Sequence, residues 1–186
     1  MAGNNGATLT DGVVLLRPWL PEDAPAVFAA CQDPLIARFV PIIPQPYTEA
    51  DASAFVEARQ QDWSGQHERS FAIVDAQTGA LLGSIARHGR AAHRATFDCW
   101  LAPHARGCGI ATRALRLICD WTLATTQVVR LDLHTDVEND ASGRVAERAG
   151  FVREGICRAW DLDREGRPRD VIFYVRVRAD DQVGYT

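Results

Sequence analysis

No stretch of the 186-residue sequence approaches the ~18 consecutive apolar residues that a membrane-spanning helix needs, so we expect no membrane partner. Positive charge is not in excess, because 20 Lys and Arg stand against 24 Asp and Glu, a net charge of −4. This balance argues against direct nucleic-acid binding and is compatible with a cationic substrate. Cysteine is limited to five residues without a C-x-x-C pair, so reduced thiols in a cytoplasmic protein and no bound metal are the simplest interpretation.

The chain is expected to form one domain. Residues 1–11 contain neither a basic residue nor a long apolar run, and they predict a disordered or frayed N-terminal tail rather than a signal peptide. Residues 12–180 are long enough for a substantial core, and no repeat or linker divides them.

The apolar spacing predicts an α/β (α+β) fold with a mixed, mostly antiparallel sheet of about six to seven strands flanked by about four helices. The expected strands span 13–17, 70–75, 81–88, 94–101, 128–135, 151–159 and 171–178. The expected helices span 21–31, 48–62, 108–126 and 139–149. Segment 33–47 is expected to be irregular, with one short helical turn before Phe39, and segment 161–170 to be a polar loop.

The most informative segment is the run Arg-Gly-Cys-Gly-Ile-Ala at 106–111, between an expected strand and a long amphipathic helix. Glycines at such a junction let successive N–H groups turn toward one point, and the helix N-terminus adds partial positive charge there. The junction therefore suits a phosphate or pyrophosphate. A Rossmann dinucleotide turn is excluded, because the glycine spacing differs and no acidic residue ends a following strand about 20 residues on.

This arrangement resembles the GNAT superfamily of acyl-CoA-dependent N-acyltransferases, and within it the ribosomal-protein N-terminal acetyltransferase (RimJ/RimL-like) branch. The family signature Arg/Gln-x-x-Gly-x-Gly/Ala is filled by Arg106, Gly109 and Ala111. A second match is Asn139-x-x-Ser142 followed by Gly-Phe at 150–151. The similarity extends over roughly residues 13–178.

The resemblance implies acetyl-CoA as the co-substrate, held where two central strands splay apart to form a cleft. The pantetheine arm would pair with the main chain of the strand end, as an added strand does. Asn139 would bond a pantetheine amide, and Ser142 would lie near the thioester. The implied cofactor-binding residues are Trp100, Leu101, Ala102, Arg106, Gly107, Cys108, Gly109, Ile110, Ala111, Thr112, Asn139 and Ser142.

The catalytic candidates are Ser142, Asp98 and His134, and each has a structural alternative. Many superfamily members have a tyrosine that acts as the general acid where this chain has Ala146. Its absence leaves Ser142 or a water to protonate the leaving thiolate. Ser142 could also be a capping residue. Asp98, on a strand that borders the cleft, is either the base or part of a cross-strand ion pair with an arginine. Histidine as a residue type suits a general base at neutral pH, so His134 is either that base or an exposed strand-end residue.

Several neighbouring residues are weaker candidates for a role in the site. Cys108 is rejected as a nucleophile, because a residue that cradles pyrophosphate lies far from the thioester. Cys99 is expected to pack in the core. His67, Glu68 and Arg69 could line the substrate mouth or be solvated.

The functional hypothesis is transfer of an acetyl group from acetyl-CoA to a primary amine by direct attack, without a covalent enzyme intermediate. The acceptor partner is a protein N-terminus or a small amine-bearing molecule, and a homodimer is compatible with the resemblance. One alternative is a non-catalytic acyl-CoA-binding or regulatory module, supported only by the missing tyrosine. Another is a transferase that uses a different acyl-CoA, such as succinyl-CoA.

Overall fold

The computed structural model describes residues 7–61 and 68–178, so the candidate His67 lies outside the described residues. One sheet contains the eight described strands, in the order β1-β2-β3-β4-β5-β6-β8-β7. The strands are β1 Leu9–Thr10, β2 Val14–Arg17, β3 Glu68–Asp75, β4 Leu81–Ala91, β5 Arg94–Leu101, β6 Arg130–Asp136, β7 Val152–Leu162 and β8 Pro168–Val177. The α-helices are α1 Ala24–Cys31, α2 Pro34–Phe39, α3 Glu49–Gln61, α4 Ile110–Thr125 and α5 Asp140–Arg148.

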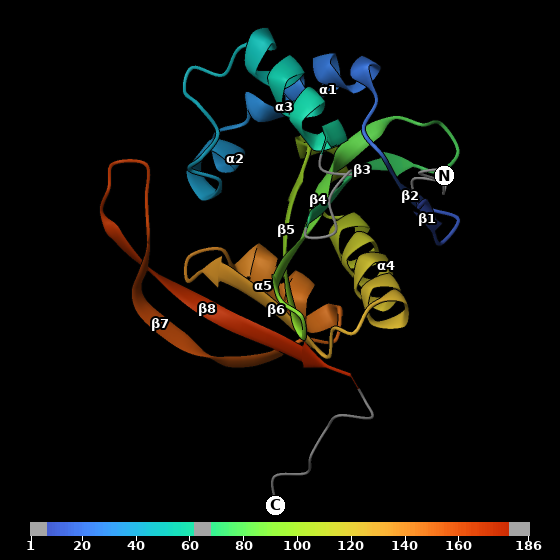
Figure 1. Ribbon diagram of the computed structural model, residues 1–186. Coiled ribbons are helices and arrows are strands. Elements are labelled where there is room, and N and C mark those ends of the chain that lie inside the picture. The colour runs from blue at the N-terminus through green and yellow to red at the C-terminus, as the bar shows by residue number, and fades with distance from the viewer. Residues whose placement is uncertain (1–6, 62–67, 179–186) are drawn as a thin grey trace, which may run out of the picture.

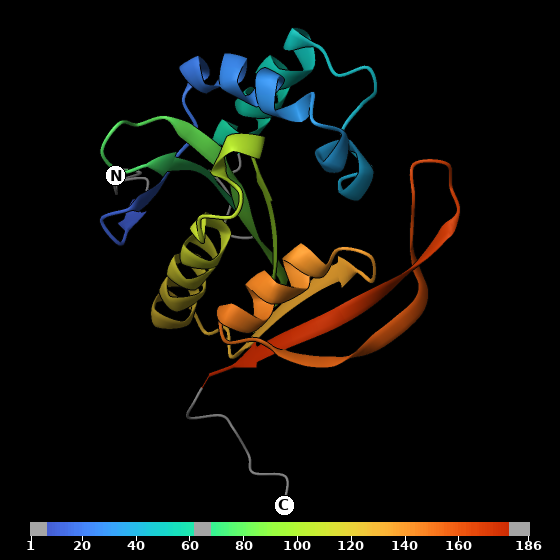
Figure 2. The same cartoon turned by 180° about the vertical axis from the view of Figure 1, so that it is seen from behind.

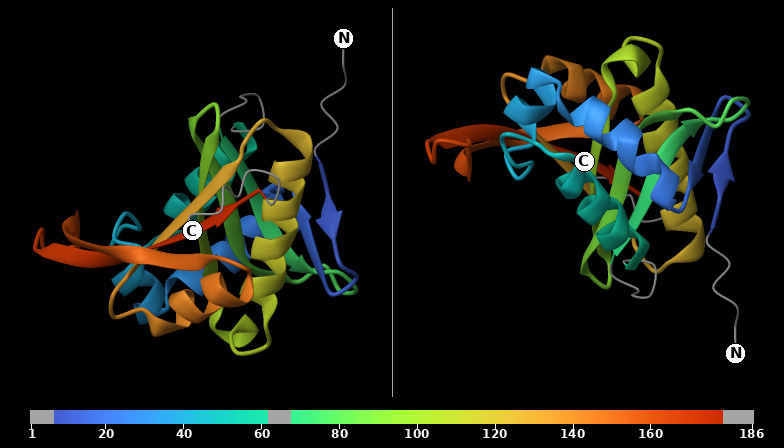
Figure 3. Two further views of the ribbon diagram at one scale, coloured as in Figure 1. Left: turned by 90° about the horizontal axis from the view of Figure 1, so that it is seen from below. Right: turned by 90° about the horizontal axis from the view of Figure 1, so that it is seen from above.

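The predicted mixed, mostly antiparallel sheet is confirmed, since only β5 and β6 pair in parallel. The additional strand is β1, formed by Leu9–Thr10 in the segment expected to be a tail. The expected loop 161–170 is shorter than predicted and spans 163–167, because β7 runs to Leu162 and β8 begins at Pro168. The resulting long hairpin projects from the rest of the molecule (Figure 3).

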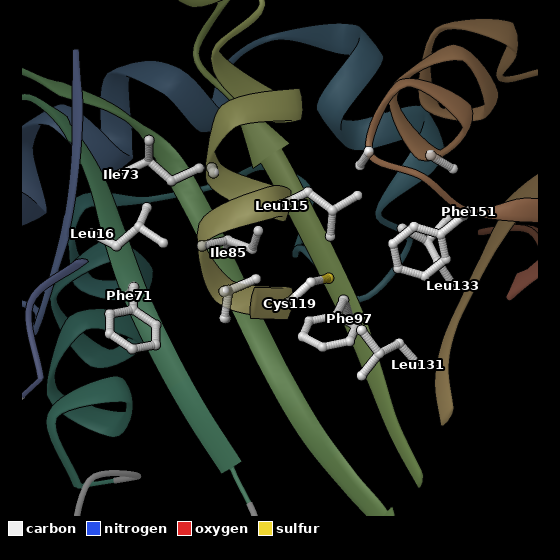
Figure 4. Close-up of a cluster of buried hydrophobic side chains, with 14 of the residues drawn as sticks. Leu16, Phe71, Ile73, Ile85, Phe97, Leu115, Cys119, Leu131, Leu133 and Phe151 are labelled. Atoms are coloured by element: carbon white, nitrogen blue, oxygen red, sulfur yellow. The ribbon is translucent and has the colours of Figure 1, made fainter. Parts of the chain in front are cut away.

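Helices cover both faces of the sheet and make two cores (Figures 1 and 2). On one face, α4 places Leu115 and Cys119 against Phe71, Ile85 and Phe97 of β3 to β5 (Figure 4). On the other face, a second cluster joins α1 and α3 to the sheet. Its most buried members include Trp19, Val27, Val56 and Val74. The hydrophobic side chains of β3 alternate between these two cores, as the period of a strand requires.

The helix ends follow local signals in the sequence. Thr48 and Asp51 bond each other reciprocally at the start of α3, a capping box. Asn139 accepts from the Ser142 N–H at the start of α5, and Gly150 has a φ of +88° just after its end. Asn139 and Gly150 thus mark the two ends of α5 beside the cleft.

The two central strands separate after a short paired stretch. Parallel pairing of β5 and β6 runs from Arg94 opposite Arg130 to Thr96 opposite Asp132. Beyond it, β5 stays paired with β4 up to Leu101, while β6 stays paired with β8 up to Asp136. The two strands therefore run apart, as expected for a splayed sheet (Figure 1).

A close approach between α5 and β8 yields a stability prediction. Gly143→Ala is expected to lower the free energy of unfolding by about 2 kcal/mol, because the added Cβ would lie 2.7 Å from the Tyr174 hydroxyl oxygen. In a Tyr174→Phe background the nearest atom would be Cζ at 3.5 Å, and alanine should then stabilise α5 by about 0.8 kcal/mol. Urea denaturation of the four proteins gives the coupling energy. Equal effects of Gly143→Ala in both backgrounds would contradict the contact.

Candidate active site

A cleft of about 720 Å³ opens where β5 and β6 separate, and it extends from the α5 side of the sheet to the α3 side. It gathers predicted residues from both strands and from α5, together with residues of β3, β4 and α3. The predicted members are Asp98, Trp100, His134, Asn139 and Ser142. Three predicted parts are not in its lining: Leu101, which ends β5, Ala102, and the turn at 106–112, which comes after the short helical turn Pro103–Ala105.

The turn before α4 has the geometry of an anion site. Gly107 and Gly109 both have a φ of +78°, and a Cβ built on either would meet no atom within 4 Å. Within the described part of the chain, the N–H groups of residues 107 to 112 have no hydrogen-bond acceptor, and the first helical bond of α4 runs from Arg113 N–H to the Gly109 carbonyl. Consecutive free N–H groups at a helix N-terminus with open space before them fit a pyrophosphate.

Arg106 holds this turn in place through its side chain. One guanidinium nitrogen lies 2.8 Å from Asp33 Oδ1 and 3.1 Å from the Leu101 carbonyl oxygen. Asp33 also caps α2 by accepting from two N–H groups of its first turn. The hydrogen bond from Arg106, with these backbone bonds, holds the pKa of the Asp33 carboxyl below its usual range. The Arg106 side chain is thus engaged within the protein, which leaves its neighbours' main chain to meet a ligand.

The end of β5 offers an edge for an extended ligand, because β6 no longer pairs with it beyond Thr96. Two of its predicted groups already have partners. The Ala102 N–H donates to the Leu82 carbonyl oxygen at 2.9 Å, and the Leu101 carbonyl accepts from Arg106. A pantetheine arm would have to use other main-chain groups of this stretch.

Asn139 and Ser142 stand together at the start of α5, on the cleft wall. The Asn139 Oδ1 serves as the helix cap, which leaves the amide nitrogen without an acceptor among the described residues. The half-buried Ser142 hydroxyl likewise bonds no described group. Ala146 is fully buried in the core and cannot stand in for the absent tyrosine.

Asp98 has a histidine partner rather than the arginine that the alternative reading of the sequence proposed. Its Oδ2 lies 2.5 Å from His88 Nε2, and His88 Nδ1 lies 3.3 Å from Glu68 Oε1. Glu68 in turn pairs with Arg59 of α3. The hydrogen bond that the His88 ring donates to the Asp98 carboxylate raises the pKa of His88, although partial burial opposes this shift. Sequence reasoning did not identify His88. The signal was its place at the end of the predicted strand 81–88, which is followed by the predicted strand 94–101 that carries Asp98.

His134 lies on the other cleft strand with a different environment. Its ring stacks on Phe173 with 5.4 Å between the ring centroids, and Phe173 also meets Trp160 edge to face at 5.1 Å. The His134 Nε2 is 3.8 Å from Asp161 Oδ2, too far for a hydrogen bond. His134 is therefore held by packing more than by a charge partner.

The two cysteines of this region are both exposed. The expectation that Cys99 packs in the core is wrong, because it projects into the cleft where β6 no longer covers β5. Cys108 lies in the turn, and its Sγ is 3.6 Å from the Arg106 carbonyl oxygen.

Charged pairs join α2 to the β7–β8 hairpin. The Glu138 Oε2 atom forms ion pairs with Arg38 Nη2 of α2, at 2.7 Å, and with Arg169 Nη2 of β8, at 3.0 Å. The Arg164 guanidinium donates to the Ala37 carbonyl oxygen at 3.0 Å. A second cavity, of about 740 Å³, lies among these residues. Most of the charged side chains that line it form ion pairs with one another.

Neither a membrane-spanning helix nor a metal-binding cluster occurs in the described ranges, 7–61 and 68–178. No helix there is both long and apolar enough to cross a membrane. No group of three or more His, Cys, Asp or Glu side chains there is arranged to hold a metal ion.

A splayed sheet, a glycine turn with free N–H groups and a cleft between them define an acyltransferase of the GNAT type. The chain belongs to this family, because the acetyltransferase (GNAT) domain matches residues 14–152. The spermidine N(1)-acetyltransferase of Escherichia coli K12 is 28% identical over 145 residues, which cover 76% of this chain and 74% of the relative.

Solved structures share the fold. RimJ of Mycobacterium smegmatis, in complex with CoA-disulfide, superposes with a TM-score of 0.83 at 21% identity, covering 99% of this chain and 93% of that one. RimL, a ribosomal L7/L12 alpha-N-protein acetyltransferase in complex with coenzyme A, also gives a TM-score of 0.83, at 19% identity, covering 94% of this chain and 100% of that one. At these identities the likeness establishes the fold.

Proposed function

We propose that this acetyltransferase transfers an acetyl group from acetyl-CoA to a primary amine by direct attack of the amine on the thioester. The observation that carries the donor assignment is the row of unpartnered N–H groups at 107–112 beside the end of β5. Such a row favours a diphosphate, and the adjoining cleft is large enough to receive a pantetheine arm. Binding of coenzyme A by RimJ and RimL supports this assignment.

The proposed chemistry needs a proton acceptor for the amine, a proton donor for the leaving thiolate, and a group that orients the thioester. An ammonium acceptor loses a proton to Asp98 or His134, its lone pair attacks the acetyl carbonyl, and the C–S bond of the tetrahedral intermediate breaks. The thiolate takes a proton from Ser142 or from a water held there, and the second proton that the attacking nitrogen gives up as the amide forms restores that donor. Asn139 has a free amide for the pantetheine, which would fix the thioester in place.

The acceptor class is either a protein N-terminus or a small amine. The ribosomal-protein substrate named for RimL supports the first, and the spermidine N(1)-acetyltransferase supports the second. The cleft lining favours a cationic acceptor of either class, because its five carboxylates outnumber its three arginines. The carboxylates are those of Asp51, Glu68, Asp98, Asp136 and Asp161.

Two further parts of the proposal concern the state of the protein. All five cysteines are free thiols, which supports a reducing, cytoplasmic location. We also propose a homodimer; size-exclusion chromatography with light scattering measures the mass of the particle against the 20.5 kDa chain.

Release of coenzyme A thiol tests the proposal. Purified protein is mixed with acetyl-CoA and three acceptors: a lysine-free peptide with a free α-amine, the same peptide with a blocked N-terminus, and a polyamine. Release that depends on a free amine is the expected result, and the preferred amine identifies the acceptor class. Faster release from succinyl-CoA would contradict the acetyl assignment. Tight acetyl-CoA binding without turnover of any amine would instead support a non-catalytic module, which the alanine at 146 favours.

A further inference from the structure

Three side chains from three neighbouring strands meet on the α3 face of the sheet, inside the cleft. They are Glu68 of β3, His88 of β4 and Asp98 of β5. His88 is the central member, with one carboxylate oxygen at 2.5 Å from Nε2 and another at 3.3 Å from Nδ1. Its side chain is 26% exposed, whereas that of Asp98 is 65% exposed. Asp98 is therefore the member that a ligand in the cleft reaches, and His88 lies behind it.

The strand register produces this cluster. Glu68 is directly opposite His88 in the antiparallel pair of β3 and β4. His88 is opposite Thr96 in the next pair, and Asp98 lies two residues beyond Thr96 on the same face. Each of the three residues lies within a paired stretch of its strand, so the side chains are held by strands rather than by loops.

His88 differs from His134, the other histidine of the cleft, in the number of carboxylates that contact its ring. His134 has a single carboxylate, at 3.8 Å, and stacks on Phe173. An imidazolium at His88 would instead be balanced by a carboxylate at each ring nitrogen. An isolated carboxylate is a weak base at neutral pH, so a relay from Asp98 to a histidine matches the proton acceptor to the operating pH.

We infer that His88 is a positioning residue of the proposed N-acetyl transfer, which receives the amine proton by way of Asp98. This inference rests on the proposed function. In the step, a proton leaves the ammonium for a carboxylate oxygen of Asp98, and the carboxylic acid so formed passes a proton to Nε2 of neutral His88. Asp98 returns to its ionised state, the imidazolium lies between two carboxylates, and the free lone pair of the amine attacks the thioester.

The inference predicts a pH dependence with a defined sign. Only neutral His88 accepts a proton, so kcat/KM should rise with pH through the pKa of His88. The charged groups that face His88 among the described residues are Asp98, Glu68 and, with the opposite effect, Arg90. Arg59 pairs with Glu68, the carboxylate at Nδ1 of His88. Because Asp98 raises the pKa of His88 above 6.5, the rise should lie above that pH.

The test compares pH profiles of kcat/KM for the wild type, His88→Gln and Asp98→Asn, with His93→Gln as a matched control in the β4–β5 turn. Glutamine can still donate to Asp98 but does not titrate. We expect His88→Gln to lose the rise with pH and about 100-fold in kcat/KM near pH 7.5, with an unchanged Kd for acetyl-CoA. His93→Gln should match the wild type.

The outcomes separate the two proposals. A His88→Gln enzyme with the wild-type profile overturns the role of His88 and leaves the transferase assignment intact. A wild-type protein without turnover on any amine overturns the proposed function itself. In that event NMR titration of the histidines still measures the interaction between His88 and Asp98. A His88 pKa that does not fall in the Asp98→Asn variant overturns the relay.

Discussion

Gly109→Val is expected to weaken acetyl-CoA binding at least 100-fold while the protein stays folded. At a φ of +78° a branched residue is strained, and its side chain would occupy the open space in front of the N–H groups. Displacing the diphosphate from two charge-assisted hydrogen bonds, each worth about 1.5 kcal/mol or more, corresponds to a loss of about 100-fold. Isothermal titration with acetyl-CoA measures the effect.

The matched control is Gly79→Val in the β3–β4 turn. Gly79 has a φ of +74° and equally open surroundings, so it carries a similar conformational cost away from the cleft. Both variants should lose similar stability in urea denaturation, and only Gly109→Val should lose affinity. Unchanged affinity in Gly109→Val would mean that the diphosphate binds elsewhere, and the donor assignment would fail with it.

Gly83→Ala is expected to lower the free energy of unfolding by about 3 kcal/mol. An added Cβ would lie 2.2 Å from the main-chain oxygen of Trp100, a clash with backbone that no side-chain rotation relieves. Gly83 pairs with Leu101 at the end of β5, so the strands must shift where the pantetheine is proposed to bind. The midpoint of urea unfolding and the Kd for acetyl-CoA should therefore both change.

Gly155→Ala serves as the control for this substitution. Gly155 also lies in a strand, β7, but an added Cβ there meets no atom within 4 Å. Its unfolding midpoint should stay close to that of the wild type. Equal midpoints for Gly83→Ala and Gly155→Ala would contradict the close approach of β4 and β5.

Much of the fold could be predicted because its signals are local. Period-2 alternation places Phe97 on one face of β5 and Asp98 on the other, and β5 has the bounds that the sequence predicts. The capping residues Thr48 and Asn139 act within one helical turn. β1 was missed because two residues, Leu9–Thr10, carry no periodic signal and are ordered only by pairing with β2.

The sequence by itself determined where the chain turns from strand to helix and where glycines leave main-chain N–H groups free, because backbone freedom and apolar period depend on neighbouring residues. Only the tertiary structure decided which side chains meet. It pairs His88 with Asp98, commits Arg106 to Asp33 and exposes Cys99 in the cleft. These contacts depend on the register of β3, β4 and β5 and on the point where β5 and β6 part, which no single segment encodes.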